Sequence, residues 1–338
     1  MTRTKMARTH GVLLLAVALV AGCDKGSPAA GTGQPAPAAA KPATTAAKSA
    51  RSGDASAEEV AREARGDVPC PAKSTLPARA AEAPVDDALG VRPGMSYEEA
   101  VAAVLCTHPL LVAAPEVSRN FRMNSYGQAI RQGFTARNAE PRVEKSGKQI
   151  VQEMQRDAVA RSLNSRREDL VPGASKWYLA TMGVPGRERV ISVGRDERYA
   201  SEQSPTVEAT RAALIKKYGT PTQERRASPT ELPTLRWAHD PAGRPVPEGT
   251  PLFTRCVSHP DPDVGVSLNP DCGLVVEAML MPQKSNPDLV DRLKLTIVDQ
   301  GGGYRSISET EAALGRGDAQ RRAQEVEKSA KAGKAPSL

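Results

Sequence analysis

The start of the chain constrains the fold most, because it separates a leading segment from the part that can fold. Arg3, Lys5 and Arg8, with no acidic residue among them, precede an apolar run over residues 11–20. Such a run is too short to cross a bilayer as a helix, and a basic start before a short apolar run is typical of a secretory signal. We therefore expect residues 1–22 to be a signal peptide.

The apolar run closes on Val20-Ala21-Gly22-Cys23, which resembles the lipobox of bacterial lipoproteins. The resemblance implies that Cys23 is lipidated and becomes the first residue, anchored to a membrane by several acyl chains. The alternative is an ordinary signal peptide that leaves Cys23 as a plain thiol. Asp24 resembles an inner-membrane retention signal of enterobacterial lipoproteins, which favours the inner membrane. The outer membrane is the alternative location. Either membrane leaves the folded part in the periplasm.

Residues 23–67 are expected to hold the lipidated cysteine and a disordered tether. From residue 24 to about 53 the chain is mostly Ala, Pro, Gly, Ser and Thr, and it has almost no large apolar side chain to offset the entropy of ordering. Such a tether has a root-mean-square reach of roughly 30–40 Å. Ser56 and Glu59 are spaced as a capping box, which predicts a short helix over residues 56–65.

Four further cysteines follow Cys23. They are Cys70, Cys106, Cys256 and Cys272. An even number of cysteines in an oxidising compartment favours disulfides. Three pairings are possible, and proximity favours Cys70 with Cys106 and Cys256 with Cys272. No CxxC motif occurs, so a zinc site is a weak alternative.

Hydrophobic periodicity predicts three helices and several strands. The helices are expected at residues 96–106, 147–164 and 204–219, the first with a Ser96–Glu99 capping box and the last capped by Ser204. The strands are expected at residues 176–182, 187–193, 234–240, 272–281 and 292–299, with a pairing segment at 251–257. In 292–299, Leu293, Leu295 and Ile297 point inward and Lys294, Thr296 and Val298 face water.

These elements predict an α+β fold, in which amphipathic helices pack on an antiparallel sheet stapled by disulfides. The folded region is expected from residue 68 to 314, as parts 68–200 and 201–314 that each combine helix and sheet. A capping box at Ser308 and Glu311 then leads into a polar, basic tail over 315–338 that frays, with residues 318–331 expected to be transiently helical. The glycine-rich residues 300–304 are expected to form a flexible turn.

Residues 91–105, VRPGMSYEEAVAAVL, resemble the opening of the periplasmic lipoprotein domain of BamE (SmpA/OmlA) and of related β-lactamase-inhibitor-like domains. Gly94, Met95, Ser96, Glu99 and Leu105 stand at comparable places. The resemblance covers about fifteen residues, and it implies a helix-plus-sheet domain that binds other proteins and has no catalytic residues to carry over.

The formal net charge is +7, and loss of the three basic residues in the signal lowers it to +4. That surplus is too mild for a polyanion-binding protein, and aromatic residues make up only 3% of the chain, which gives no stacking platform for bases. We therefore expect no nucleic-acid partner. The expected partners are the membrane, through the lipid anchor, and a protein of the cell envelope.

The best cluster of oxygen ligands is the loop at residues 256–272. Asp261, Asp263, Asn269 and Asp271, with Ser267, place oxygens at alternate positions as some calcium loops do. The pattern lacks the acidic ligands of an EF-hand, and a proline- and glycine-rich turn pinned by a disulfide is the simpler interpretation. No cofactor is predicted.

His108, His239 and His259 are the candidate general bases of the mature chain. No Gly-x-Ser-x-Gly, Ser-x-x-Lys or His-Glu-x-x-His motif accompanies them. We therefore expect a non-catalytic protein-binding or scaffolding role in the envelope. The alternatives are an immunity or inhibitor lipoprotein against a toxin or hydrolase, and an envelope hydrolase that uses one of these histidines.

Overall fold

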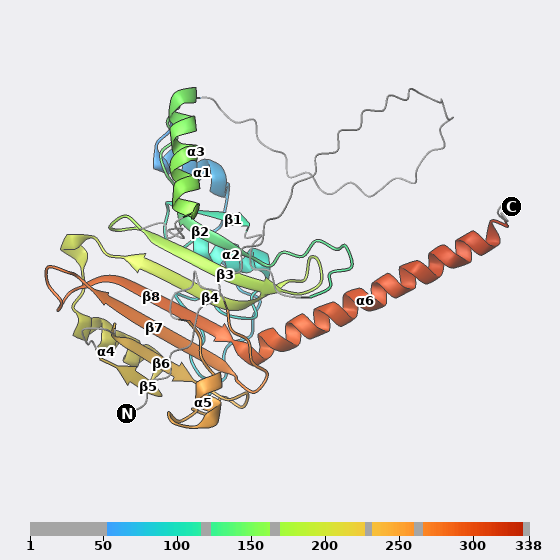
Figure 1. Ribbon diagram of the computed structural model, residues 1–338. Helices are drawn as coiled ribbons and strands as arrows, with labels where there is room; N and C mark the ends of the chain where they lie inside the picture. The colour runs from blue at the N-terminus through green and yellow to red at the C-terminus, as the bar shows by residue number, and fades with distance from the viewer. Residues whose placement is uncertain (1–52, 116–122, 163–169, 227–231, 260–265, 334–338) are drawn as a thin grey trace, which may run out of the picture. The chain divides into compact units, whose positions relative to one another are not determined.

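The computed structural model of the protein describes residues 53–115, 123–162, 170–226, 232–259 and 266–333. All of them belong to one compact unit, Ser52–Leu338 (Figure 1). Helices pack on an eight-stranded antiparallel sheet, so the predicted α+β class is confirmed. In the described part of the chain, no helix is both long enough and apolar enough to span a membrane.

The strands form two meanders of four that meet in the middle of the sheet. The order is β1-β2-β3-β4-β8-β7-β6-β5, and each neighbouring pair is antiparallel. The strands are β1 (Leu111–Pro115), β2 (Gly133–Asn138), β3 (Ser175–Met182), β4 (Arg189–Arg198), β5 (Gln223–Arg225), β6 (Thr234–Ala238), β7 (Leu274–Pro282) and β8 (Val290–Asp299).

Local capping chemistry starts most of the helices. The helices are α1 (Ala57–Arg65), α2 (Tyr97–Leu105), α3 (Gly147–Ser162), α4 (Val207–Tyr218), α5 (Pro251–Arg255) and α6 (Gln300–Lys331). The predicted capping boxes at Ser56 and Ser96 are both present. Helix α4 is capped by Thr206 and not by Ser204 as predicted, because a 3-10 turn at Ser201–Gln203 precedes it and the Ser204 hydroxyl donates to Ala200 O.

The two meanders repeat one arrangement, in which a helix is followed by four strands. In the first half, Val190 N at the start of β4 donates to Met95 O just before α2, at 2.8 Å. In the second half, Val290 N at the start of β8 donates to Pro205 O just before α4, at 2.9 Å. The halves join where β4 pairs with β8, with Arg195 opposite Leu295.

The main core lies between the sheet and the two helices α2 and α4. Its largest fully buried side chains include Trp177, Trp237, Phe134 and Ile297. On the opposite face, α5 packs Phe253 against the Cys256–Cys272 disulfide, and α6 begins beside β3 and β4. The sheet is therefore covered by α2 and α4 on one face and by α5 and the start of α6 on the other.

Both disulfides favoured by proximity are confirmed. Cys70 is bonded to Cys106, 36 residues away, and joins the N-terminal segment to the end of α2. Cys256 is bonded to Cys272, 16 residues away, and joins the end of α5 to the start of β7.

The predicted wet face of β8 is wrong. Lys294 and Thr296 are 4% and 2% exposed, and Val298 is fully buried. The buried carboxylate of Asp196 lies beside them, accepting hydrogen bonds from Arg292 Nε and Nη2, both at 2.6 Å, with Lys294 Nζ at 3.8 Å. The alternation of side chains correctly separated the two sides of β8. On the side of Lys294, however, the charged groups pair with Asp196 and are not in contact with water.

The segment 251–257, predicted as a strand, contains helix α5. Pro251 stands at its first position, and the Thr250 hydroxyl accepts a hydrogen bond from Phe253 N at 3.2 Å. A capping threonine before a proline is a helix start, which outweighed the apolar residues that follow.

The predicted turn at residues 300–304 and the predicted helix start at Ser308 are wrong, because α6 is one helix from Gln300 to Lys331. Asp299 caps it by accepting from Gly302 N at 2.9 Å, and Ser308, the predicted cap, lies inside it. The glycines serve close packing, since a Cβ at Gly301 would lie 2.5 Å from Cys272 O. Residues 319–333 are exposed throughout.

The folded part begins earlier than residue 68. Ala61 of α1 is 1% exposed, and Arg65 Nη1 donates to Pro109 O at 2.6 Å. Ala55 forms a bridge with Arg142, so the chain is already part of the fold at the first residues described.

Candidate binding groove

The residues predicted as sites fall in several places. Cys23 lies outside the described residues, and so do Asp261 and Asp263. Of the remaining calcium candidates, Asn269 Oδ1 accepts from Asp271 N at 3.0 Å, and Asp271 Oδ2 accepts from Arg255 Nη1 at 2.6 Å. Within the described ranges, no group of three or more His, Cys, Asp or Glu could hold a metal ion. The calcium site stays a prediction.

The histidines lie at separate element ends. His108 follows α2, and its Nδ1 accepts from Leu110 N at 3.2 Å. His239 follows β6 in the other half of the sheet, and burial lowers the pKa of its imidazole. His259 follows α5 and is exposed. The contacts described for His108 and His239 are to backbone, which gives both a local structural role.

An apolar groove of about 450 Å³ opens beside α4, on the helix-covered face of the sheet. Its floor is formed by Leu293 and Leu295 of β8 and by Arg195 of β4. Ala209 and Ala213 of α4 are exposed along one wall. The opposite rim is formed by the turn Ala88–Leu89.

Leu89 at this rim has an unusual backbone. Ala88 N and Val91 N each donate to the other's carbonyl at 2.9 Å, and the two residues between them have φ of +49° (Leu89) and +83° (Gly90). Positive φ at both central positions defines a type I′ turn, which favours Asn, Asp or Gly. A leucine there costs of order 1 kcal/mol. Leu89 nevertheless remains 55% exposed, so burial in the core does not explain it.

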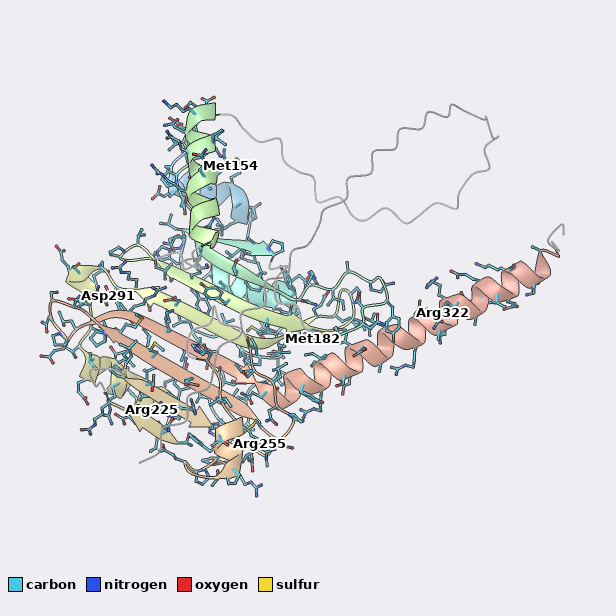
Figure 2. All side chains as sticks on the ribbon, viewed as in Figure 1. Met154, Met182, Arg225, Arg255, Asp291 and Arg322 are labelled. Carbon is cyan, nitrogen blue, oxygen red and sulfur yellow. A yellow bond between two sulfur atoms is a disulfide. The ribbon has the colours of Figure 1, made fainter. Side chains whose placement is uncertain are left out.

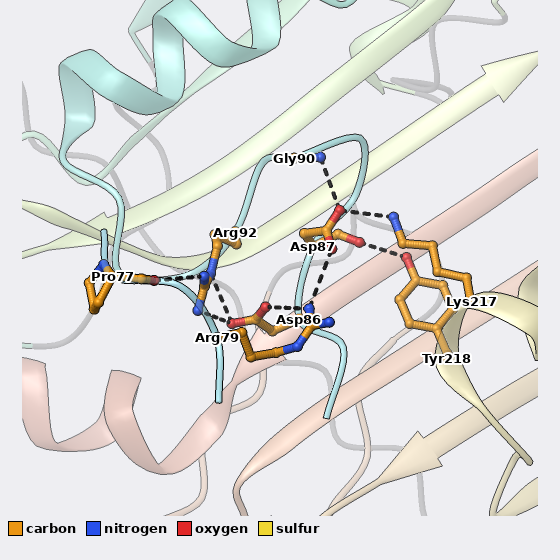
Figure 3. Close-up of polar contacts among 8 residues, drawn as sticks. All are labelled: Pro77, Arg79, Asp86, Asp87, Gly90, Arg92, Lys217 and Tyr218. Atoms are coloured by element: carbon orange, nitrogen blue, oxygen red, sulfur yellow. Dashed lines mark hydrogen bonds and ion pairs between the residues drawn. The ribbon is translucent and has the colours of Figure 1, made fainter. Parts of the chain in front are cut away.

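Asp87 holds this turn against α4 (Figure 3). Its carboxylate accepts from Gly90 N at 3.0 Å and from Lys217 Nζ at 2.9 Å, and its carbonyl accepts from the Tyr218 hydroxyl at 2.9 Å. Burial would raise the pKa of the Asp87 carboxyl, but the bonds from Lys217 and Gly90 outweigh it and lower that pKa. The turn is therefore fixed to the second half while its leucine stays outside.

Asp86 fixes the same turn to the N-terminal segment. It accepts from Arg92 Nε at 3.1 Å and lies 3.6 Å from Arg79 Nη1. Arg92 Nη1 also donates to Pro77 O (Figure 3). Arg79 Nη1 also lies 3.8 Å from Asp87 Oδ1, so one arginine contacts both aspartates and the rim is held by the N-terminal segment as well as by α4.

Arg195 supplies the polar group of the groove floor. Its Nη2 pairs with Glu197 at 2.8 Å and its guanidinium lies 5.6 Å from the centre of the Trp177 ring. Its Nε is buried and has no hydrogen-bond partner in the described structure. The side chain is 19% exposed, so the floor of the groove carries a positive charge among apolar residues.

The tyrosines of the groove do not ionise near neutral pH. Burial, with the nearby Glu197 carboxylate, raises the pKa of Tyr199 to about 12. Burial raises the pKa of Tyr218 as well. These two phenols therefore stay neutral beside the cationic Arg195 and Lys217, and the described lining is suited to holding an apolar group with a nearby acceptor rather than to exchanging protons.

Comparison with protein-family models, curated proteins and solved structures gives no match to this chain. The groove must therefore be interpreted from its own geometry.

Sequence reasoning did not single out the groove. Its one readable signal is Leu89-Gly90 between Ala88 and Val91, where a turn would favour a polar first residue. The other half of the groove depends on which surface of α4 stays uncovered, and periodicity alone does not predict that.

Proposed function

We propose that this chain is a membrane-anchored periplasmic lipoprotein, held by a lipidated Cys23, whose folded part binds an envelope protein through the groove beside α4. The binding role is carried by one observation, the exposed Leu89 held in a left-handed turn at the rim of an apolar groove. A strained, exposed apolar residue points to a contact with another molecule, because it does not stabilise the isolated fold.

The groove favours a protein partner over a small ligand. Small-molecule pockets cover most of their ligand, whereas this groove continues onto the exposed face of α4. Its volume of about 450 Å³ suits two or three apolar side chains, and the partly exposed Arg195 guanidinium supplies a positive charge that attracts a carbonyl or carboxylate between them. The proposed partner therefore presents an apolar segment with an acceptor oxygen.

The anchor is tested by mass spectrometry of the mature N-terminus and by membrane fractionation. We expect diacylglycerol and acyl masses on Cys23, and release of the protein from the membrane fraction in Cys23→Ala. An unmodified Cys23 in a protein that stays in the cytosol contradicts the proposal.

The groove is tested by co-purification from detergent-solubilised membranes, using two neighbouring alanines of α4. Ala213 lines the groove, whereas Ala212 is exposed but does not line it. Ala213→Trp fills the groove and should remove the co-purifying partner, while Ala212→Trp should retain it. Equal retention, or equal loss, would contradict a groove-bound partner. A toxin or hydrolase as the captured protein would establish the inhibitor form of the same role.

A further inference from the structure

Exposed apolar side chains are concentrated in the connection between β2 and β3. Ten large apolar residues of the described chain are well exposed, and half of them lie between residues 143 and 171. Three of these are on α3: Ile150 at 46%, Val151 at 53% and Met154 at 64% exposure. This clustering separates α3 from the scattered single apolar residues that any surface carries.

Over residues 147–156, helix α3 is exposed on both its apolar and its polar side. Ile150, Val151 and Met154 fall within about 100° of its circumference, and Gln152, Gln155 and Arg156 lie on the remainder. Every residue from Gly147 to Arg156 is exposed, and the side chains around Met154 stand clear of the sheet (Figure 2). A helix of this length is marginal in water by itself, so a surface that covers the apolar side would stabilise it.

The anchored end of the chain enters the fold beside α3. Ala55 N donates to Arg142 O at 2.9 Å, Arg142 N donates back at 2.8 Å, and Glu144 N donates to Asp54 Oδ1 at 2.8 Å. These contacts lie within five residues of the start of α3. The segment that leads from Cys23 therefore reaches the folded part at the same end that carries the exposed apolar side chains.

We propose that α3 is an interfacial membrane helix, which lays Ile150, Val151 and Met154 into the surface of the bilayer that holds the lipidated Cys23. This inference rests on the proposed lipid anchor. Lys148 borders the apolar side next to Val151 and has no acidic partner among the described side chains, which suits an anionic headgroup.

The size of the apolar side favours a bilayer over a second copy of the chain. A stable interface buries roughly 800 Å² on each partner, and three side chains that are already partly covered fall far short of that. A bilayer needs much less, because the anchor keeps α3 near the membrane at an effective concentration on the order of millimolar, where weak insertion is enough.

The first test places a fluorescent label on each side of α3 in the lipidated full chain. Met154→Cys and Gln152→Cys each add one free thiol, since the four other mature cysteines are in disulfides. In vesicles of equal parts phosphatidylcholine and phosphatidylglycerol, spin-labelled lipid should quench the label at 154 several-fold more than the label at 152. Equal, weak quenching at both positions in protein that floats with the vesicles would overturn the proposal. Flotation and the mass of Cys23 report the anchor separately.

The second test replaces the anchor by a high lipid concentration. In the Cys23→Ala chain, vesicles of the same composition at roughly millimolar lipid match the effective concentration that the anchor supplies. Met154→Ser should lower co-sedimentation several-fold, because an apolar side chain is lost from the interface. The matched variant Gln152→Ser, on the polar side, should sediment as its parent does. A parent that does not sediment, or equal sedimentation of both variants, would overturn the proposal.

Discussion

The two halves of the sheet carry equivalent helices, but only one of these helices is covered from outside. In α2, Glu98 alone is exposed among nine residues, because Val68 and Leu76 of the N-terminal segment pack on the core there and Cys70 is bonded to Cys106. In α4, five of twelve residues are exposed. The same helix-on-sheet frame thus gives a closed half and an open half. The groove exists because the N-terminal segment covers α2 but contacts α4 only near its end, where Asp87 accepts from Lys217 and Tyr218.

Removing the staple over α2 should have the largest effect on stability. The double variant Cys70→Ser, Cys106→Ser opens a loop of 36 residues and should lower the free energy of unfolding by about 4 kcal/mol, compared with about 3 kcal/mol for Cys256→Ser, Cys272→Ser with its 16-residue separation. Denaturant titration measures both. Hydrogen exchange in residues 97–105 should also rise toward that of α4, and unchanged protection would show that the segment is not what closes the first half.

Breaking the ion pair at the junction of the halves should come next. Asp196→Asn leaves the buried Arg292 and Lys294 without their carboxylate and should cost about 3 kcal/mol. Asp291→Asn is the matched control, because its pair with Arg198 is one-third exposed and should cost less than about 1 kcal/mol. Equal losses in denaturant titration would mean that burial of the junction is not what matters.

Replacing the rim leucine should separate stability from binding. Asn is favoured at the first central position of a type I′ turn, so Leu89→Asn should leave the free energy of unfolding unchanged or raise it by up to about 1 kcal/mol. Partner retention in co-purification should fall by about tenfold, since a half-exposed apolar contact is lost. A destabilised variant with normal retention would assign Leu89 to the fold instead.

The smallest expected effect is on how stability depends on pH, which should differ between the start of α2 and the start of α4. Burial would raise the pKa of the Glu99 carboxyl, but hydrogen bonds from Thr75 and Ser96 outweigh it and lower that pKa to about 2. Since the folded value is below the ordinary 4.5, the stabilisation from Glu99 is present above pH 4.5 and is lost as the pH falls toward 2. Glu99→Gln should flatten this part of the stability curve. Thr206→Ser at the start of α4 should leave it unchanged, because the capping hydroxyl does not titrate.

What the sequence could predict depended on whether a signal was local. Two helix starts were predicted from capping boxes of four residues, Ser56 with Glu59 and Ser96 with Glu99. The spacing of the cysteines favoured the observed disulfide pairs. Strands β1 and β2 were missed because their burial comes from distant partners. Lys294 was placed in water because its partner, Asp196, is 98 residues away in the chain.

The groove could not be predicted from the sequence, because it too depends on contacts between residues that are distant in the chain. Its rim depends on the backbone angle of Leu89, and its opening depends on a segment that covers α2 but not α4. The exposed apolar side of α3 was predictable only in part. Its amphipathic period predicted the helix, while only the structure showed that residues 147–156 are exposed on every side.

Photo-crosslinking from position 89 in the anchored, full-length chain tests the central claim most directly. A photoreactive residue in place of Leu89 should capture one membrane-associated protein, and Ala213→Trp in the same chain should abolish the product. The same residue in place of Val326, which is 70% exposed on the far part of α6, should give no such product. A product of equal yield from both positions, or one that survives the filled groove, would contradict binding at the open half of the sheet.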